Sequence, residues 1–377
     1  MSGLIRKVLR DGGPGFCQFA ITDACNARCA FCNFNADAEP SRKRVFVEPE
    51  QAARALEVLA RNGVEYVAFV GGEPALHPAL GELLSHSRQL GMTTLVCTNG
   101  ATLTAQWVEH LADAGLDSVI ISIDAADAET HERNRGLPGV CSRIADANSR
   151  FRALGVSTTA SVTISRLIPD LEALPVFLES LGFDAVTFSY PLRMLQSSFR
   201  GFSSSNLINY SADELCLAFD QILGLKRRFP VLNPAASLEE MKRFVRGERQ
   251  LFPCLAGFKY FYLDWKFDLY RCHAWHEPMC AIWDFDSSKL VRDGCTKCMI
   301  DCYRDASVLQ GIAVAVYDAW RCASRGQIAT AFGRAINRSA LGSARAVLER
   351  GAWARRVRLP GNGAKNALRG VTTPRNR

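Results

Sequence analysis

The stretch Cys25-Asn26-Ala27-Arg28-Cys29-Ala30-Phe31-Cys32 carries three thiols at the spacing C-x3-C-x2-C. Thiolate is the soft ligand that holds iron in iron–sulfur clusters. A four-iron cluster normally takes four such ligands, so three thiols in one short loop leave one iron open. An open metal position is where a substrate or cofactor can bind. Three free buried cysteines, or part of a zinc site, are the alternatives for this stretch.

Outward from this loop, short apolar runs alternate with stretches of helical spacing. The runs predict strands at residues 16–22, 66–70, 93–97, 118–123, 157–164 and 185–189. The helical spacing predicts helices at residues 48–62, 104–114, 140–154 and 170–181. Repeated β–α units imply a parallel sheet with right-handed crossovers. A curled sheet of this type carries its chemistry at the C-terminal ends of the strands.

Candidate ligand-binding residues follow three of these predicted strands. Gly71-Gly72-Glu73-Pro74 follows the second, Thr98-Asn99-Gly100 the third, and Ser122-Ile123-Asp124 the fourth, with Arg133-Asn134-Arg135-Gly136 beyond it. Two glycines let a backbone approach a ligand closely, and a carboxylate can accept from an ammonium group. Each motif alone also fits a plain turn. Their shared place after the strands predicts one site.

In this order, the motifs resemble those of the radical S-adenosylmethionine (SAM) superfamily, over about residues 15–190 and more loosely to 305. The resemblance implies a partial (β/α)6 TIM-type barrel. It also implies that Cys25, Cys29 and Cys32 bind a [4Fe–4S] cluster whose open iron chelates SAM. By the same resemblance, the residues expected to line SAM are Phe31, Gly71, Gly72, Glu73, Pro74, Asn99, Ser122, Asp124 and Arg166.

A second group of cysteines lies further along the chain. Cys254 and Cys272 flank residues 258–270, which read as a hairpin, and Cys280 and then Cys295-x2-Cys298-x3-Cys302 follow. Four thiolates that include a C-x2-C suit a structural zinc ribbon by spacing. The order is similar to the SPASM and twitch auxiliary domains of radical SAM enzymes. That resemblance implies a second [4Fe–4S] cluster, held by Cys254, Cys272, Cys295 and Cys298.

Some residues of this region receive no role. Cys280 and Cys302 stay unassigned, since the cysteine count supports one auxiliary cluster. His273 and His276 lie beside Cys272, and either could be a metal ligand, but we expect both to be exposed turn residues. The segment 294–303 also resembles the C-terminal cysteine segment of the adenosylhopane synthases, radical SAM enzymes that add the deoxyadenosyl group to a polycyclic lipid. A lipid or isoprenoid substrate is therefore the runner-up.

Charge is unevenly distributed along the 377 residues. Residues 321–377 hold twelve Arg, one Lys and the single acid Glu349, which gives this segment a net charge of +12. The whole chain has a net charge of +7, so the first 320 residues carry −5. Residues 312–358 have a basic, amphipathic helical pattern, which suits an anionic membrane, an acidic partner or a packed helix with a solvated face. Residues 361–377 are expected to be disordered, and residues 37–43 exposed.

These patterns predict the α/β class: the partial barrel, a small C-terminal cysteine-rich domain and a basic helical tail. The expected divisions are an N-terminal extension (1–14), the core barrel (15–230), the auxiliary iron–sulfur domain (231–305) and the tail (306–377). The segment 191–230, with its Ser-rich part 197–205, is expected to be a loop and helix over the barrel mouth. No apolar run approaches the ~18 residues of a membrane span, and no secretory signal is recognisable. Fourteen Cys without such a signal favour metal ligation and the cytoplasm, with peripheral contact at the inner membrane surface through the tail.

The resemblance implies an enzyme that cleaves SAM to a 5′-deoxyadenosyl radical, which abstracts hydrogen from a small-molecule, peptide, sugar or lipid substrate. It implies a flavodoxin- or ferredoxin-type electron donor, and we expect no nucleic-acid partner. The alternative from another class is a non-catalytic iron–sulfur or zinc protein that docks on a partner through the basic tail.

Overall fold

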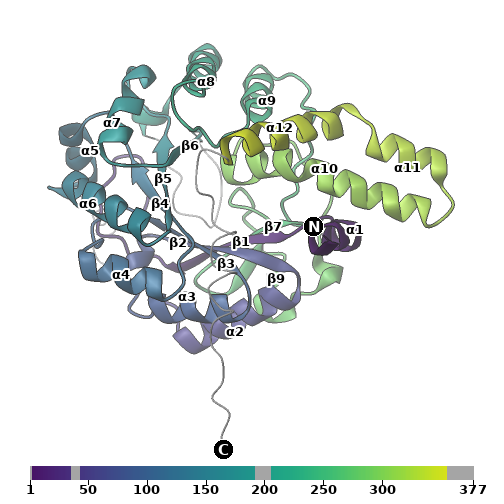
Figure 1. Ribbon diagram of the computed structural model, residues 1–377, viewed down its shortest axis with the longest axis horizontal. Coiled ribbons are helices and arrows are strands. Elements are labelled where there is room, and N and C mark those ends of the chain that lie inside the picture. Colours follow the sequence, from purple (N-terminus) through teal and green to yellow (C-terminus); the bar gives the residue numbers. More distant parts are fainter. Residues whose placement is uncertain (1, 35–42, 192–204, 355–377) are drawn as a thin grey trace, which may run out of the picture.

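One continuous sheet organises the molecule. The computed structural model describes residues 2–34, 43–191 and 205–354. Within them the sheet has nine strands in the order β6-β5-β4-β3-β2-β1-β7-β8-β9 (Figure 1). The strands are β1 (Gly15–Thr22), β2 (Val64–Gly71), β3 (Thr93–Thr98), β4 (Ser118–Ile123), β5 (Ser157–Thr163), β6 (Ala185–Ser189), β7 (Tyr260–Leu263), β8 (Asp268–Tyr270) and β9 (Cys280–Ala281). The six strands predicted from the sequence are confirmed.

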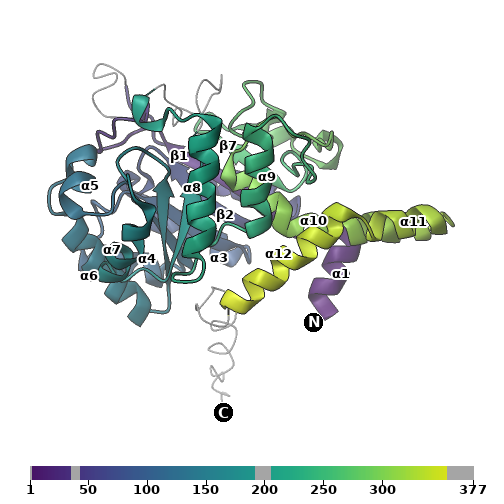
Figure 2. The ribbon, with the colours of Figure 1, turned by 90° about the horizontal axis from the view of Figure 1, so that it is seen from above.

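The first six strands are all parallel, and their spatial order follows their order in the chain. Each right-handed crossover therefore steps in the same direction and leaves its helix on the same face, which curls the sheet into a partial barrel with helices outside (Figures 1 and 2). The connecting helices are α2 (Pro49–Arg61), α3 (Leu80–Gln89), α4 (Ala105–Asp113), α5 (Ala128–Arg135), α6 (Val140–Ala153), α7 (Leu174–Ser180) and α8 (Ala212–Leu225). The predicted (β/α)6 partial barrel is confirmed.

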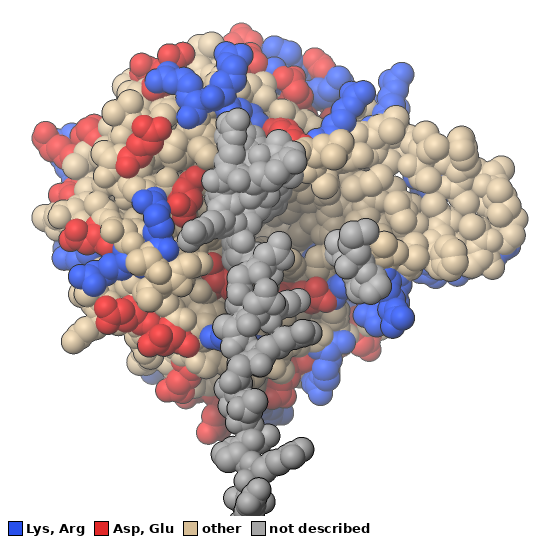
Figure 3. All heavy atoms as spheres, in the orientation of Figure 1, with Lys and Arg blue, Asp and Glu red and all other residues tan. Residues whose placement is uncertain are grey.

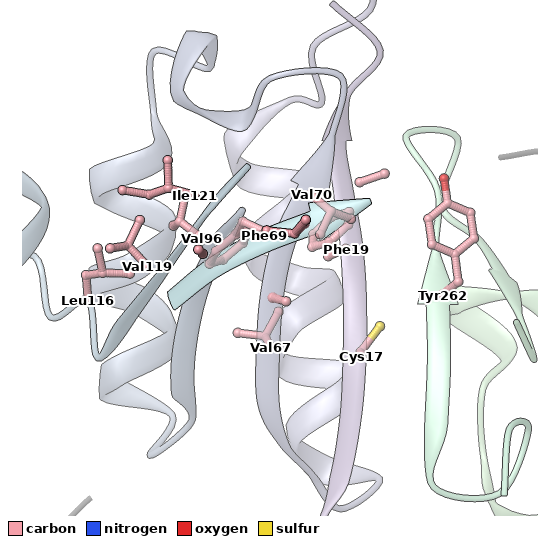
Figure 4. Close-up of a cluster of buried hydrophobic side chains, with 14 of the residues drawn as sticks. Cys17, Phe19, Val67, Phe69, Val70, Val96, Leu116, Val119, Ile121 and Tyr262 are labelled. Carbon is pink, nitrogen blue, oxygen red and sulfur yellow. The ribbon is translucent and has the colours of Figure 1, made fainter. Parts of the chain in front are cut away.

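The main core lies between the sheet and these helices. Parallel pairing sets Phe19 beside Phe69 and Phe69 beside Val96, so these side chains share the helix-facing side of the sheet (Figure 4). All three are fully buried, as is Leu56 of α2. Each such side chain contributes about 1.5–3 kcal/mol by leaving water. This outer core holds the strand ends, and so the loops after them, in place.

The predicted hairpin of residues 258–270 is confirmed as antiparallel β7 and β8. Its attachment was not predicted. β7 pairs in parallel with β1, from Phe16 beside Tyr260 to Phe19 beside Leu263. The cysteine-rich region therefore extends the barrel sheet instead of standing apart from it. The division of the chain at 230/231 remains a prediction.

Helices form most of the described C-terminal part. They are α9 (Ala235–Val245), α10 (Asp301–Ala323), α11 (Ile328–Ala335) and α12 (Arg338–Ala354). α10 begins before the predicted boundary at 306 and packs against α1 (Ser2–Asp11), where Gln310 donates to the carbonyls of Gly12 and Pro14. α10 and α11 form a hairpin that projects from the body (Figure 2). Among the described helices, none combines the length and apolarity that crossing a membrane requires. Most of 37–43 and of 197–205, and all of 361–377, lie outside the described residues.

Candidate functional site

The three thiols of the sequence motif come together directly after β1, in the segment 23–34, which we call the cysteine loop. Burial raises the pKa of Cys29 to about 11 and that of Cys32 to about 12. The charge of Cys25 raises the pKa of Cys29 further, and the charge of Cys29 does the same to Cys32. The three sulfurs therefore lie within electrostatic reach of one another. A soft cation that displaced their protons would relieve this mutual repulsion.

The turn after β2 holds the cysteine loop by its backbone. The N–H of Gly72 donates to the carbonyl of Thr22 at 3.0 Å, and the N–H of Glu73 donates to the carbonyl of Ala24 at 2.7 Å. A Cβ on Gly72 would overlap the Ala24 carbonyl, and a Cβ on Gly71 would overlap that of Thr22. Both glycines therefore admit the backbone of the cysteine loop. Their predicted role in SAM binding remains a prediction.

Glu73 is a buried carboxylate, 1% exposed, that joins the ends of β2 and β3. Its Oε1 accepts from the Thr98 hydroxyl at 2.7 Å and from the Ala75 N–H at 3.1 Å, and its Oε2 accepts from the Asn99 N–H at 2.7 Å. Burial raises the pKa of Glu73, while these hydrogen bonds oppose the rise. A carboxylate has about four acceptor positions, so one on Oε2 is left for a further donor.

Asn99 extends this connection to the cysteine loop. Its Nδ2 donates to Oδ1 of Asn26, between the first two cysteines, at 2.7 Å. Its own Oδ1 accepts from the N–H of Ala101 at 2.9 Å, which fixes the orientation of the amide. A hydrogen bond between two side chains thus joins the end of β3 to the cysteine loop. Asn26 had no predicted role.

Asp124 and Arg135 form a buried ion pair beside the thiols. An oxygen of Asp124 accepts from Arg135 Nη2 at 2.7 Å, and the other accepts from Asn134 Nδ2 at 2.9 Å. The carbonyl of Arg135 accepts from the N–H of Arg28, inside the cysteine loop, at 2.8 Å. The positive charge of Arg135 opposes the burial that raises the Cys29 pKa. A cation therefore lies close to the thiols, on a residue to which the sequence motif alone gave no role.

The remaining predicted SAM residues are less clearly joined to this group. Phe31 is 8% exposed and lies within the cysteine loop, and Ser122 is half-buried near the end of β4. Arg166 instead binds the start of α8, where its Nη2 donates to Glu214 at 2.9 Å and its guanidinium lies 4.7 Å from the ring centre of Tyr210. Among the described residues, we find no contact between Arg166 and the cysteine loop. The roles of all three, like that of Pro74, remain predictions.

The four predicted auxiliary ligands also come together. The N–H of Cys254 donates to the carbonyl of Cys295 at 2.9 Å. Burial raises the pKa of Cys272 to about 12 and that of Cys298 to about 11, and the charge of Cys254 contributes to both. The charge of Cys295 adds to the rise at Cys298. The four thiols therefore share one neighbourhood.

An ion pair fixes the loop that carries Cys295. Arg271 donates to both oxygens of Asp293, each at 2.8 Å, and Asp293 accepts from the N–H of Cys295 at 3.2 Å. This contact ties the residue before Cys272 to the segment that supplies the next two thiols. In the described part of the chain, no three His, Cys, Asp or Glu side chains are arranged to hold a single metal ion. The ligands of a four-iron cluster bind different corners of a larger cage.

The two unassigned cysteines have other neighbours as well. Cys280 is on β9, where it pairs with Leu269. Cys302 lies near Asp301 and Gln18, and it also packs against the buried cluster that contains Cys254 and Cys272. The prediction for His273 was wrong: it is 5% exposed and packs edge-on against the rings of Tyr262 and Tyr303. His276 is exposed, as predicted.

Comparison with known proteins bears on this geometry. Residues 19–170, which contain the cysteine loop and the first three strand-end motifs, match the model of the Radical SAM superfamily. The chain carries a radical SAM domain. The chain is 27% identical to the AdoMet-dependent heme synthase of Oleidesulfovibrio alaskensis, over 47% of this chain and 46% of that one. It is 29% identical to the PqqA peptide cyclase of Rhodopseudomonas palustris, over 45% and 46%.

The chain thus spans less than half the length of these curated relatives. Among solved structures, the chain is similar to Streptococcus suis SuiB bound to precursor peptide SuiA. The TM-score is 0.55 at 16% identity, and the match covers 80% of this chain and 73% of SuiB. That likeness shows a shared fold.

Proposed function

We propose that the chain is a radical SAM enzyme that removes a hydrogen atom from its substrate. The bound [4Fe–4S] cluster and SAM supply the chemistry, because a one-electron reduction cleaves SAM to methionine and a 5′-deoxyadenosyl radical. One observation carries the proposal. Three converging thiols are tied by hydrogen bonds to the ends of three parallel strands, through Glu73, Asn99 and the Asp124–Arg135 pair.

The protein residues hold and orient these groups. Cys25, Cys29 and Cys32 are the proposed cluster ligands, and their donor type suits iron. The remaining acceptor position on Glu73 suits the SAM ammonium group, in a buried site where a charge-assisted hydrogen bond is strong. The thiol of Cys29 is buried and those of Cys25 and Cys32 are partly buried, which limits the access of water to the reactive centre. Reduced, anaerobic protein should therefore release methionine and 5′-deoxyadenosine from SAM, and a chain that only docks on a partner would not.

We further propose a second [4Fe–4S] cluster on Cys254, Cys272, Cys295 and Cys298. Their shared neighbourhood supports it, as does the similarity of their order in the chain to the SPASM and twitch auxiliary domains. A four-thiolate zinc site is the rival assignment, because zinc accepts the same donor set. The cluster could take an electron from the substrate or position it. Its reduction and that of the first cluster would need a flavodoxin- or ferredoxin-type donor.

Metal content distinguishes these assignments. Anaerobically reconstituted protein should carry about eight irons, as two four-iron clusters require. The triple variant Cys25→Ala, Cys29→Ala, Cys32→Ala should keep about half of them. Cys280→Ala is the matched control and should keep the full content, because Cys280 lies apart from both groups of thiols. About four irons and one zinc in the parent protein would instead assign the second site to zinc.

The substrate class follows less directly. One relative is named as a peptide cyclase, and the similar SuiB structure contains a precursor peptide. We take a peptide or another polar metabolite as the leading substrate class. A lipid substrate remains the second candidate, and one observation favours it. The α10–α11 hairpin exposes Ile328 (66%), Phe332 (67%) and Ile336 (53%), and Figure 3 shows this arm as a largely uncharged surface.

Membrane binding by this arm is testable. Anionic vesicles should pull the protein down at low salt and release it at high salt, because each Arg near an anionic surface contributes about 1 kcal/mol and salt screens it. The double variant Ile328→Asp, Phe332→Asp should lose the binding. Leu217→Asp, on an equally exposed site of α8, is the control and should not. Point variants are preferable to truncation, because Glu349 of α12 pairs with Lys226.

If the parent protein stays in the supernatant with anionic vesicles at low salt, the arm does not bind membranes. The lipid candidate then keeps as support only the cysteine segment 294–303.

A further inference from the structure

The side of the sheet that faces away from the helices is lined by small polar side chains. Along β3, β4, β5 and β6, buried residues alternate with half-buried ones near the strand ends. Pairing places the half-buried residues on one face, with Ser122 beside Ser161 and Ser161 beside Thr187. The outer core is closed and apolar. The inner face is partly accessible and rich in hydroxyl groups.

The first turn of α10 reaches this inner face between the two edges of the partial barrel. Asp301 accepts from the Ser189 hydroxyl, at the end of β6, at 3.4 Å. Cys302 lies next to Asp301, 3.7 Å from Sγ to Oδ2, and close to Gln18 of β1. The Oε1 of Gln18 is buried with no hydrogen-bond partner among the described residues. Asp301 and Cys302 therefore bridge the gap between the first and sixth strands from inside.

Asp301 differs from the carboxylate one turn later. Asp305 accepts from the Tyr190 hydroxyl at 3.0 Å and from Asn233 Nδ2 at 2.6 Å, and it also binds Ser237. These donors fill its acceptor positions, so Asp305 is a structural group. Among the described side chains, none donates to Oδ1 of Asp301. Burial and the charge of Asp305 raise the pKa of Asp301 to about 7, as expected for a carboxylate with few donors.

Asp301 also faces the proposed SAM site. Cys97, at the end of β3, lies within reach of the charges of both Glu73 and Asp301, since both raise its pKa. Cys97 therefore lies near two carboxylates, Glu73 beside the cysteine loop and Asp301 at the start of α10. A molecule bound between the SAM position and α10 would meet Asp301, Cys302 and the hydroxyls of the strands.

We propose that Asp301, at the inner face of the partial barrel, receives a hydrogen-bond-donating group of a polar substrate, an amine or a hydroxyl. The inference rests on the proposed function and narrows its substrate class. Hydroxyl side chains and a carboxylate with a free oxygen suit a peptide side chain or a polar metabolite. A polycyclic hydrocarbon would leave these groups buried and unpaired, at a cost of about 1–3 kcal/mol each.

Two thiols, Cys97 and Cys302, lie near Asp301, and their rates of chemical labelling measure how accessible the inner face is. The probes are two methanethiosulfonates of equal size, one with a trimethylammonium group and one with a sulfonate. Cluster-loaded protein is exposed briefly to each without oxygen at pH 8.5, and the labelled cysteines are read by mass spectrometry. The same thiolate attacks both probes, so the small fraction of Cys302 that is ionised affects both labelling rates equally and cancels in their ratio. Cys302 should react about tenfold faster with the cationic probe, because a carboxylate in a cleft concentrates cations.

Asp301→Asn should remove this preference at Cys302. Asp213→Asn, which deletes the same charge from an exposed site on α8, should leave it unchanged. Cys17, fully buried on the outer face, should stay unlabelled in every sample. Cys302 as inert as Cys17 would show that the inner face is closed, and equal rates with both probes in the parent protein would show that Asp301 selects no charge. Either result overturns the proposal. SAM cleavage, assayed in the same preparation, reports separately on the proposed function.

Discussion

Cys29→Ala protein is expected to form no 5′-deoxyadenosine above the level of a reaction without protein. The change removes one of three thiolates around the proposed cluster, and SAM can chelate only an iron that the cluster presents. The fold should persist, since Cys29 is not part of the main core, which is built from residues such as Phe69 and Val96. Circular dichroism and product analysis by mass spectrometry measure the two properties on one sample.

Cys216→Ala is the matched control. Cys216 is also a buried thiol, on α8, and it belongs to neither group of converging cysteines. It should keep both its iron and its SAM cleavage. Parental amounts of 5′-deoxyadenosine from Cys29→Ala protein would remove the assignment of this loop as the cluster site.

Gly72→Ala should weaken SAM binding at least tenfold, about 1.4 kcal/mol, and lower the iron content of the first site. The added Cβ would overlap the Ala24 carbonyl, so the turn after β2 and the cysteine loop must separate. That movement breaks the hydrogen bond from Glu73 to Ala24, which shapes the loop. Steric strain of this kind typically costs 1–3 kcal/mol. Equilibrium binding of SAM to reconstituted protein measures the effect.

Gly224→Ala adds the same methyl group where nothing lies within 4 Å, near the end of α8. It should leave iron content and SAM affinity unchanged. If Gly72→Ala also behaved like the parent protein, the close approach of the two backbones would not matter for the site. The Gly71–Gly72 pair would then be an ordinary turn.

The local pattern of the sequence was enough to predict the barrel. The predicted strands are confirmed, because the helix-facing side of the sheet buries apolar residues such as Phe19, Phe69 and Val96. The spacing of the cysteine loop and the motifs after β2, β3 and β4 predicted which residues meet, because the C-terminal ends of parallel strands share one edge. Asn99 and Asp124 lie there, held to the loop by Asn26 and Arg135.

Contacts between distant segments were beyond the sequence pattern. Nothing in residues 258–270 indicates that β7 pairs with β1, because a strand edge carries no mark of its partner. The sequence pattern singled out the segment 133–136, which contains Arg135. Only the fold shows that the Arg135 side chain donates to Asp124 and that its carbonyl accepts from the N–H of Arg28. The spacing of the cysteines left Cys302 without a role. In the structure it lies in the first turn of α10, beside Asp301.

His273 shows the same limit from another direction. A histidine beside a cysteine in a predicted turn is usually exposed, and the prediction followed that rule. The aromatic rings of Tyr262 and Tyr303, from β7 and α10, enclose it instead. Burial lowers its pKa to about 3, so it is neutral in the folded protein at ordinary pH.

SAM turnover by the reduced protein tests the central claim most directly. Anaerobically reconstituted protein is mixed with SAM and dithionite, and the products are separated and identified. Methionine and 5′-deoxyadenosine should form in equal amounts, and only when reductant and the cysteine-loop cluster are both present. SAM that stays intact while the protein holds its full iron content would contradict the central claim.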